Sequence, residues 1–323
     1  MLPWLVCGVF VAVLYVLFKI VTLSTDPVLT AAQLESEGAF LDEHGVKKQF
    51  PRLVQDDTVS KATLHLSVVI PAYNERERLP GMLDDAIATL TKRTEADPSY
   101  TWEIIVVDDG SRDKIHEVVA PFVKRVTSER LRLMHLAVNQ GKGGAVRKGA
   151  LVARGAFIYM ADADLAATAA ELTKIEAGLQ GLDDSGDSGR FAIAVGSRAH
   201  LKDDSVAKRK WYRTILMHGF HALVWFVGGV RDVEDTQCGY KLFTRDAAAA
   251  IFHSIQIRRW AFDVEVLRIA QWLNIPIAEV AINWSEIDGS KLDLKGMITM
   301  AKDLFRMRIM YVTGVWKVPR RLL

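Results

Sequence analysis

Two carboxylates that are one residue apart, Asp162 and Asp164, follow an apolar run over residues 156–161. The run is typical of a buried β-strand, so both aspartates are predicted to lie at its carboxyl end. Carboxylate oxygens are ligands that Mg²⁺ and Mn²⁺ prefer, and a metal held there can bind the phosphates of a nucleotide. Because surface turns are also rich in Asp, the pair needs support from neighbouring motifs.

Polar residues also follow two earlier predicted strands. The strand over residues 64–70 leads into Pro-Ala-Tyr-Asn-Glu at 71–75, and the strand over 102–107 leads into Asp-Asp-Gly-Ser at 108–111. Carboxylates, a sharp turn and free backbone N–H groups together suit a base and ribose with a phosphate nearby. One such motif is more simply a turn that caps the next helix. Two in succession, followed by the acidic pair, favour a nucleotide site.

A glycine-rich stretch over residues 139–144, Asn-Gln-Gly-Lys-Gly-Gly, precedes a predicted helix. Its glycines let the backbone approach an anion, and Lys142 adds positive charge at the helix N-terminus. The spacing is neither that of a P-loop nor that of a dinucleotide fingerprint after the first strand. Taken alone, the stretch fits an anion site and a plain helix start equally well.

Strand and helix patterns alternate through the middle of the chain. Predicted strands cover residues 64–70, 102–107, 131–136, 156–161 and 191–195, and predicted helices cover 75–92 and 144–153. Such alternation predicts an α/β fold with a mostly parallel sheet and helices on both faces. Ligands of these sheets bind beyond the carboxyl ends of the strands, where every motif above is placed.

In this order, the motifs PAYNE, VVDDGS, NQGKGGA and DADL resemble those of the inverting family 2 glycosyltransferases. The resemblance continues through Gly-Ser-Arg at 196–198, EDTQCGYKLF at 234–243 and RRWAFDVE at 258–265. It implies the GT-A nucleotide-diphosphosugar transferase fold, which is Rossmann-like with a mostly parallel central sheet. The later runs are most similar to those of members that transfer glucose from UDP-glucose to dolichyl phosphate.

Other activities stay open at this point. Members that use GDP-mannose share the first four motifs and diverge around residues 235–243, so a dolichyl- or polyprenyl-phosphate mannosyltransferase is the nearest alternative. A non-catalytic nucleotide-sugar-binding membrane protein is another, which the intact carboxylates disfavour. A glycan-polymerising transferase would share the Gln-x-x-Arg-Trp pattern of residues 256–260, but it would be expected to carry spanning helices around that pattern.

The resemblance also implies roles by position. Uridine and the diphosphate would contact Pro71, Tyr73, Glu75, Asp108, Asp109, Lys142 and Asp162. The divalent metal, Mg²⁺ or Mn²⁺, would be bound by Asp162 and Asp164. The catalytic group would consist of Asp164, Asp235, Arg259, Trp260 and Asp263. The acceptor phosphate would meet Ser197, Arg198 and Arg213.

One position departs from the pattern of the mannosyl relatives. Two residues after Asp164 the chain has Ala166, where those relatives carry a Gln that can complete the metal shell. A third protein ligand must therefore come from elsewhere, or water takes its place, as Mg²⁺ readily allows.

Asp235 occupies the place of the family's catalytic carboxylate. A phosphate monoester has a second pKa of about 6, so such an acceptor is already deprotonated and needs no general base. Asp235 would then position a cation, a sugar hydroxyl or Lys241, whereas an alcohol acceptor would require a base there. A structural, ion-paired aspartate is the simpler alternative.

The apolar segment over residues 2–23 would form a helix about 33 Å long, enough to cross a hydrocarbon core of about 30 Å. No Lys or Arg precedes it and no clear cleavage motif follows, which favours a signal anchor over a cleaved signal peptide. Lys19 is weak evidence for a cytosolic catalytic domain, and the implied acceptor places the chain in the endoplasmic reticulum membrane. A polar stalk over 24–61, a GT-A domain over 62–290 and a basic amphipathic, membrane-associated tail over 291–323 are predicted to follow.

Two stretches combine basic and apolar residues and would face the membrane. The basic residues at 208–213 lead into an apolar helix over 215–227, and residues 294–312 interleave basic with apolar side chains. A solvated basic face on a core-packed helix is the alternative for both. His218 and His221 lie one turn apart, but without a third ligand they are predicted to pack rather than to bind zinc. The net charge of +2 gives no nucleic-acid signature, and the sequence does not indicate an oligomeric state.

Overall fold

The computed structural model describes residues 29–184, 190–201, 222–285 and 294–318, together with positions 12, 15, 16, 19 and 219. The predicted anchor over residues 2–23 lies outside the described residues except at four isolated positions. Arg213, His218 and His221 also lie outside them. Among the residues that are described, no helix is both long and apolar enough to cross a membrane.

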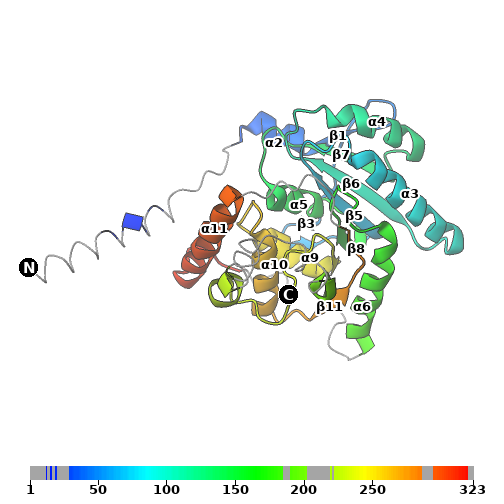
Figure 1. Cartoon of the computed structure of the whole chain (residues 1–323). Helices are drawn as coiled ribbons and strands as arrows, with labels where there is room; N and C mark the ends of the chain where they lie inside the picture. The colour runs from blue at the N-terminus through cyan, green and yellow to red at the C-terminus, as the bar shows by residue number, and fades with distance from the viewer. Residues whose placement is uncertain are drawn as a thin grey trace, which may run out of the picture.

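Seven strands form the central sheet, in the order β11-β9-β10-β8-β5-β6-β7. Figure 1 shows β11, β8, β5, β6 and β7 in this order across the sheet. Their bounds are β5 (Leu64–Ala72), β6 (Trp102–Asp108), β7 (Leu131–His135), β8 (Gly155–Met160), β9 (Ile193–Ser197), β10 (Lys241–Thr244) and β11 (Ile277–Ala281). The β5 strand pairs in parallel with β6 and β8, β6 with β7, and β9 with β11. Only β10 runs antiparallel to its neighbours in this sheet, β8 and β9. The predicted α/β fold with a mostly parallel sheet is therefore confirmed.

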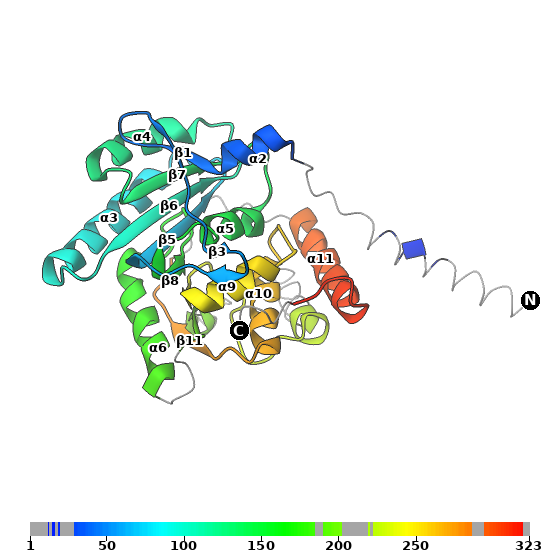
Figure 2. The same cartoon turned by 180° about the vertical axis from the view of Figure 1, so that it is seen from behind.

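Helices cover both faces of the sheet, as Figures 1 and 2 show from opposite sides. The helices are α3 (Leu79–Ala96), α4 (Ile115–Val126), α5 (Lys142–Ala150), α6 (Leu172–Asp184), α9 (Arg245–Ser254), α10 (Phe262–Trp272) and α11 (Leu294–Val312), with the short turns η1 (Ala169–Glu171), η2 (Ala199–Leu201) and η3 (Val224–Gly228). Val68 and Ile70 of β5 join a core with α3, α4 and α6, whereas Val69 joins a core with α5, α9, α10 and α11. Burial on both faces explains why the strands read as continuous apolar runs.

The segment before the sheet is folded onto the domain from residue 31 onward. It contains α2 (Ala31–Glu37) and two small hairpins, β1 (Ala39–Leu41) with β2 (Lys47–Gln49), and β3 (Val54–Gln55) with β4 (Thr58–Val59). Phe40, Phe50 and Leu53 are buried in the main core. The sequence predicts a stalk here because strands of two or three residues are too short to show periodicity. This stretch of the expected stalk is instead part of the folded domain.

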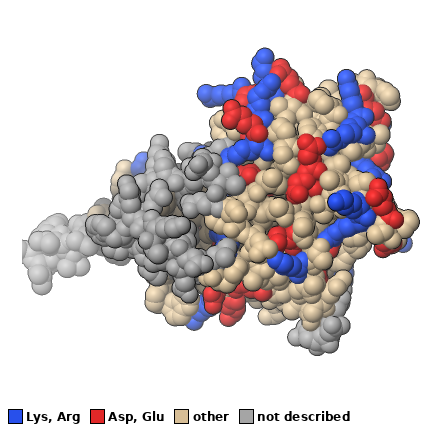
Figure 3. Space-filling model, turned by 45° about the vertical axis from the view of Figure 1, so that its right-hand side comes forward, with Lys and Arg blue, Asp and Glu red and all other residues tan. Residues whose placement is uncertain are grey.

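The helix expected over residues 294–312 is present with the same bounds as α11. Leu304 and Met307 on one side are buried in the core. Phe305 and Val312 on the other side are 45% and 71% exposed. Figure 3 shows basic and acidic side chains interspersed over the described part of one face of the molecule. The helix thus packs on the core and also presents an apolar outer side.

Candidate active site

The carboxyl ends of three parallel strands bring the predicted donor-binding residues together. Asp108 is the last residue of β6, and Asp162 and Asp164 follow β8. Lys142 begins α5, and its Nζ lies 2.6 Å from Oδ1 of Asp162. Although burial alone would lower it, the carboxylates of Asp162, Asp263 and Asp164 hold the pKa of Lys142 above its usual value. Lys142 is therefore a charged ammonium next to the acidic pair.

Both aspartates of the Asp-Asp-Gly-Ser motif are buried and bonded to the protein itself. Asp109 accepts the backbone N–H groups of Gln140 at 2.6 Å and Gly141 at 2.9 Å, so it fixes the glycine-rich loop. Burial raises the pKa of Asp109 to about 6. Asp108 lies 2.7 Å from His135 Nδ1 and accepts the N–H of Ser111. Burial works against it, but these two bonds hold the pKa of Asp108 below its usual value.

The glycine-rich loop packs closely against the Arg-Arg-Trp segment. Gly141 has a φ of +83°, and a Cβ there would lie 2.6 Å from the carbonyl oxygen of Arg258. A Cβ on Gly143 would lie 2.5 Å from the Cβ of Phe262. Lys142 Nζ lies 5.8 Å from the ring centre of Trp260. The structure therefore joins two motifs that are more than a hundred residues apart, and no side chain larger than hydrogen fits between them.

The acidic pair is held in place by the segment before β10. A Cβ on Gly239 would lie 1.9 Å from Oδ2 of Asp162, so only glycine allows this approach. The Tyr240 hydroxyl bonds both the N–H and the carbonyl of Ala167, which fixes the chain just after the pair. Burial, followed by the charge of Asp162, raises the pKa of Asp164. The fold thus keeps the carboxylates of Asp162 and Asp164 close together although their negative charges repel each other.

These two carboxylates fit a divalent cation. Two hard oxygen donors with mutual repulsion are stabilised by an ion whose remaining ligands are phosphate or water oxygens. Across the described ranges no group of three or more His, Cys, Asp and Glu side chains could hold a metal. Ala166, which stands where the mannosyl relatives carry a Gln, also predicts that the protein supplies few ligands to the metal.

Asp235 forms two side-chain hydrogen bonds with Arg198. Its Oδ2 accepts the Nε–H of Arg198 at 2.7 Å and its Oδ1 accepts the Nη2–H at 2.9 Å, while Glu279 accepts the backbone N–H of Asp235. Burial opposes the effect, yet the bonds and charge of Arg198 hold the pKa of Asp235 below its usual value. A carboxylate that is ionised and bonded in this way is a poor proton acceptor and a good support for a guanidinium.

Of the partners that the sequence left open for Asp235, Lys241 is bonded elsewhere. Its Nζ lies 2.5 Å from Oδ1 of Asp263 and donates to the carbonyls of Thr236 and Cys238. It therefore ties the Asp235 loop to α10, and the cation next to Asp235 is Arg198. Arg198 also lies over the ring of Trp284, at 5.2 Å.

The remaining predicted residues lie around this centre. Ser197 is buried at the end of β9, and its hydroxyl accepts the N–H of Ala199. Glu75 forms two hydrogen bonds of 2.7 Å with Arg78. Arg259 is exposed at the rim. Pro71 and Tyr73 are both half-buried, at the end of β5 and just beyond it.

Two residues that sequence reasoning missed form hydrogen bonds with the predicted donor-binding residues or with the glycine-rich loop. Arg78, three residues after Glu75, could have been found from that helical spacing. No local sequence pattern marks Glu37, because its partners lie about a hundred residues later in the chain. It is buried, and it accepts the N–H of Ala137, the side-chain amide of Gln140 and the ammonium of Lys148.

The family described as Glycosyl transferase family 2 matches residues 67–247. The chain belongs to this family. Within family 2, the dolichyl-phosphate beta-glucosyltransferase of Homo sapiens is 46% identical over 307 residues, which are 94% of this chain and 92% of that protein. The enzyme of the same name from Mus musculus is 48% identical, over 89% of this chain and 87% of that protein.

The fold is also similar to that of solved structures. Glucosyl-3-phosphoglycerate synthase from Mycobacterium tuberculosis, in complex with UDP, gives a TM-score of 0.51 at 15% identity. The match covers 78% of this chain and 81% of that protein. At this level of identity the likeness shows the GT-A-like fold. The family membership and the named relatives make this chain a glycosyltransferase.

Replacing Gly239 with Ala is expected to lower both activity and stability. The new methyl group would overlap the Asp162 carboxylate and push it away from Lys142. Overpacking of this kind costs about 1–3 kcal/mol, and the displaced ligand should lower kcat by about 100-fold. Thermal unfolding and initial rates would measure both effects. Gly181→Ala in α6 is the matched control, because a Cβ there meets no atom within 4 Å; wild-type behaviour of Gly239→Ala would contradict the geometry.

Glu265 predicts a pH-dependent stability. This fully buried carboxylate accepts the N–H groups of Gln256 and Ile257 and the hydroxyl of Tyr311, so it links the loop before Trp260 to α11. Burial raises its pKa to about 7. Between its unfolded pKa and pH 7 the folded protein binds the extra proton, so stability should fall as the pH rises through this window, by about 3 kcal/mol. Urea unfolding from pH 5 to 8 should show this slope, and in Glu265→Gln the slope should be smaller, because Asp109 with its own raised pKa still contributes; equal slopes in both proteins would contradict the prediction.

Proposed function

We propose that this glycosyltransferase transfers glucose from UDP-glucose to dolichyl phosphate with inversion. The product would be dolichyl β-D-glucosyl phosphate, for lipid-linked oligosaccharide assembly and protein N-glycosylation. The observation that carries the proposal is the identity of 46% and 48% with relatives named dolichyl-phosphate beta-glucosyltransferase, over most of both chains. This naming disfavours the mannosyl alternative and the non-catalytic one.

The donor would bind at the carboxyl ends of β5, β6 and β8. The glycine-rich loop, held by Asp109, and the charged Lys142 would bind the diphosphate. Asp162 and Asp164 would hold Mg²⁺ or Mn²⁺, which when bound neutralises the negative charge of the departing UDP. A structure of the Mycobacterium tuberculosis synthase in complex with Mn²⁺, UDP and glucosyl-3-phosphoglycerate, with a TM-score of 0.50, supports a divalent metal.

The acceptor would need no general base. A dianionic phosphate oxygen attacks the anomeric carbon, the bond from that carbon to UDP breaks, and UDP leaves with the electron pair. Arg198 would bind the acceptor phosphate, and Asp235 would hold the guanidinium in its orientation. Asp263 would act through Lys241, which fixes the Asp235 loop. Preorganised charges of this kind act without reorganisation during the reaction.

The surroundings proposed for this chemistry are the cytosolic side of the endoplasmic reticulum membrane. The apolar sequence over residues 2–23 supports a single-pass anchor. The exposed apolar side of α11, with Phe305 and Val312, supports contact of the C-terminal tail with the lipid surface. Such contact would bring a bilayer-embedded acceptor to the site.

A donor comparison tests the proposal. Membranes that carry the protein would be incubated with dolichyl phosphate and labelled UDP-glucose, GDP-mannose or UDP-N-acetylglucosamine, with Mg²⁺ or Mn²⁺. Transfer from UDP-glucose is expected, with little from the other two donors. Transfer from GDP-mannose alone would overturn the glucose assignment, and no transfer with any donor and either metal would favour a binding protein.

A further inference from the structure

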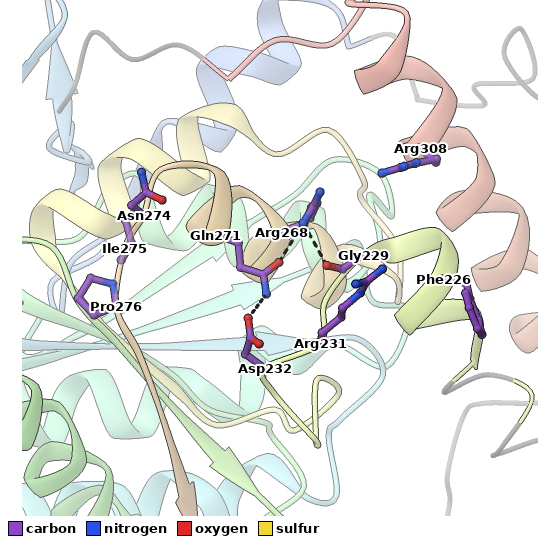
Figure 4. Close-up of a pocket in the computed structure, with 10 residues that line it drawn as sticks. All are labelled: Phe226, Gly229, Arg231, Asp232, Arg268, Gln271, Asn274, Ile275, Pro276 and Arg308. Carbon is purple, nitrogen blue, oxygen red and sulfur yellow. Dashed lines mark hydrogen bonds between the residues drawn. The ribbon is translucent and has the colours of Figure 1, made fainter.

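A second, basic pocket lies on the α11 side of the domain (Figure 4). Its volume is about 800 Å³, and it lies between the end of α10, the loop after η3 and α11. Three arginines from these three elements line it: Arg231 in the loop, Arg268 on α10 and Arg308 on α11. None of the residues that line it belongs to the candidate active site described above. A ligand of this pocket would therefore bind apart from the candidate active site.

The positive charge in this pocket is largely uncompensated. Within the described ranges none of the three arginines forms an ion pair, and Asp232 is the single carboxylate among the lining residues. The side-chain amide of Gln271 donates to Asp232 and its oxygen accepts from Arg268, as Figure 4 shows. Burial, followed by the charges of Arg308 and Arg231, lowers the pKa of Arg268. The three guanidinium groups therefore repel one another in a place where a bound anion would relieve the repulsion.

Two of the three arginines, Arg231 and Arg268, are oriented by contacts with aromatic rings, which leave their charge available. Arg231 lies over the ring of Trp225 at 4.3 Å, and Arg268 lies over Trp272 at 4.7 Å. Arg268 also donates from Nη1 to the carbonyl of Gly229, while its Nε is buried without a hydrogen-bond partner. A guanidinium group that stacks on a ring does not use its in-plane N–H groups for that contact, and these groups match phosphate oxygens.

Exposed apolar side chains lie at the basic pocket and on the helix that contributes Arg308. Phe226, on its rim, is 71% exposed, and the neighbouring Trp225 is 41% exposed. On the outer side of α11, Ile298 and Phe305 are 51% and 45% exposed. Exposed aromatic and aliphatic groups beside a basic site are typical of surfaces that lie in the headgroup region of a bilayer. A ligand that joins a phosphate to hydrocarbon chains fits both features.

We propose that the basic pocket binds the phosphate of an anionic membrane phospholipid and thereby seats η3 and α11 on the bilayer. The site would exist whichever nucleotide sugar the enzyme uses. It would hold the domain in one orientation, because three elements of the fold contribute an arginine each. Electrostatic attraction at a lipid surface and apolar insertion would then act at the same place.

Lipid binding to the full chain in neutral detergent tests this proposal. Native mass spectrometry would compare phosphatidic acid and phosphatidylserine with phosphatidylcholine, without nucleotide sugar. One anionic phospholipid should bind about 10-fold more tightly than phosphatidylcholine, and Arg231→Gln and Arg308→Gln should each remove most of this preference. The matched control is Arg125→Gln on α4, whose exposed pair with Asp84 lies far from the pocket in sequence and fold; it should bind as the wild type does.

Several outcomes would overturn the lipid assignment. Equal binding of phosphatidylcholine, or unchanged binding in both pocket variants, would show that the arginines do not select an anionic lipid. Full competition by millimolar inorganic phosphate would indicate a site for free anions. Tighter binding of dolichyl phosphate than of phosphatidic acid, lost in Arg308→Gln, would indicate an acceptor site. Glucosyl transfer from short-chain acceptors in detergent should stay unchanged in Arg308→Gln, so failure here differs from failure of the proposed activity. Arg308→Lys, which keeps the charge and the fold but loses the planar donors, should bind with intermediate affinity.

Discussion

Asp164→Asn is expected to lower kcat for glucosyl transfer by about 1,000-fold and, at the same time, to stabilise the metal-free protein. The loss of activity follows from removing one of two carboxylates that would hold the metal against the departing UDP. The gain in stability follows from the raised pKa of Asp164, which burial and the charge of Asp162 cause. A carboxyl group with a raised pKa contributes stability at low pH that is lost as the pH rises, so at pH 7 the ionised form is a penalty that Asn removes.

Because Asp164→Asn should lose activity but gain stability, general damage to the fold cannot produce the expected result. Rates and thermal unfolding would be measured at pH 7 with EDTA and again with Mn²⁺ and UDP. Wild type should gain stability from Mn²⁺ and UDP, as any ligand of the folded state provides, and Asp164→Asn should gain much less. The control Asp84→Asn breaks an exposed ion pair with Arg125 and should change neither quantity appreciably. A variant that loses activity and stability together would mean that Asp164 is structural, and one that keeps its activity would remove it from the site.

Sequence reasoning brought Lys142 and Asp162 to one edge of the sheet because the signals of their motifs are local. Each motif directly follows a buried strand, and parallel strands bring their carboxyl ends to one edge, so the proximity of Lys142 and Asp162 follows from order alone. The bounds of α11 were also predicted, because a helix of this length shows its apolar period clearly.

The partners of the charged side chains could not be predicted in the same way. The sequence left a cation, a sugar hydroxyl or Lys241 open as the partner of Asp235, and packing places Arg198 against Asp235 and Lys241 against Asp263. A buried charge takes the partner that the tertiary fold brings within reach, and no local pattern records that choice. The same holds for Glu37, which supports the glycine-rich loop from before the sheet.

Asp235→Asn should lower kcat by about 100-fold and raise the KM for dolichyl phosphate, yet leave the shape of the pH profile unchanged. The amide cannot accept two charged hydrogen bonds as the carboxylate does, so Arg198 would lose its fixed orientation. Because Arg198 holds the pKa of Asp235 below its usual value, Asp235 stays ionised as the pH falls toward 6. The acid limb of the rate should then report protonation of the acceptor phosphate, near its second pKa of about 6.

Rates from pH 5 to 8 in wild type, Asp235→Asn, Arg198→Lys and the double variant would separate support of the guanidinium from proton transfer. If Asp235 acts only by orienting Arg198, the two single changes damage the same unit, and the double variant should be little worse than either. The acid limb should keep its position in all four proteins. A limb that disappears in Asp235→Asn, with a loss near 10,000-fold and an unchanged KM, would instead identify Asp235 as a general base. Whether Asp235 orients Arg198 or accepts a proton decides how the whole site works. If the acceptor phosphate binds already deprotonated, the protein needs only to position charged groups around it. Asp235 and Arg198 are then one such unit, because the carboxylate fixes the orientation of the guanidinium.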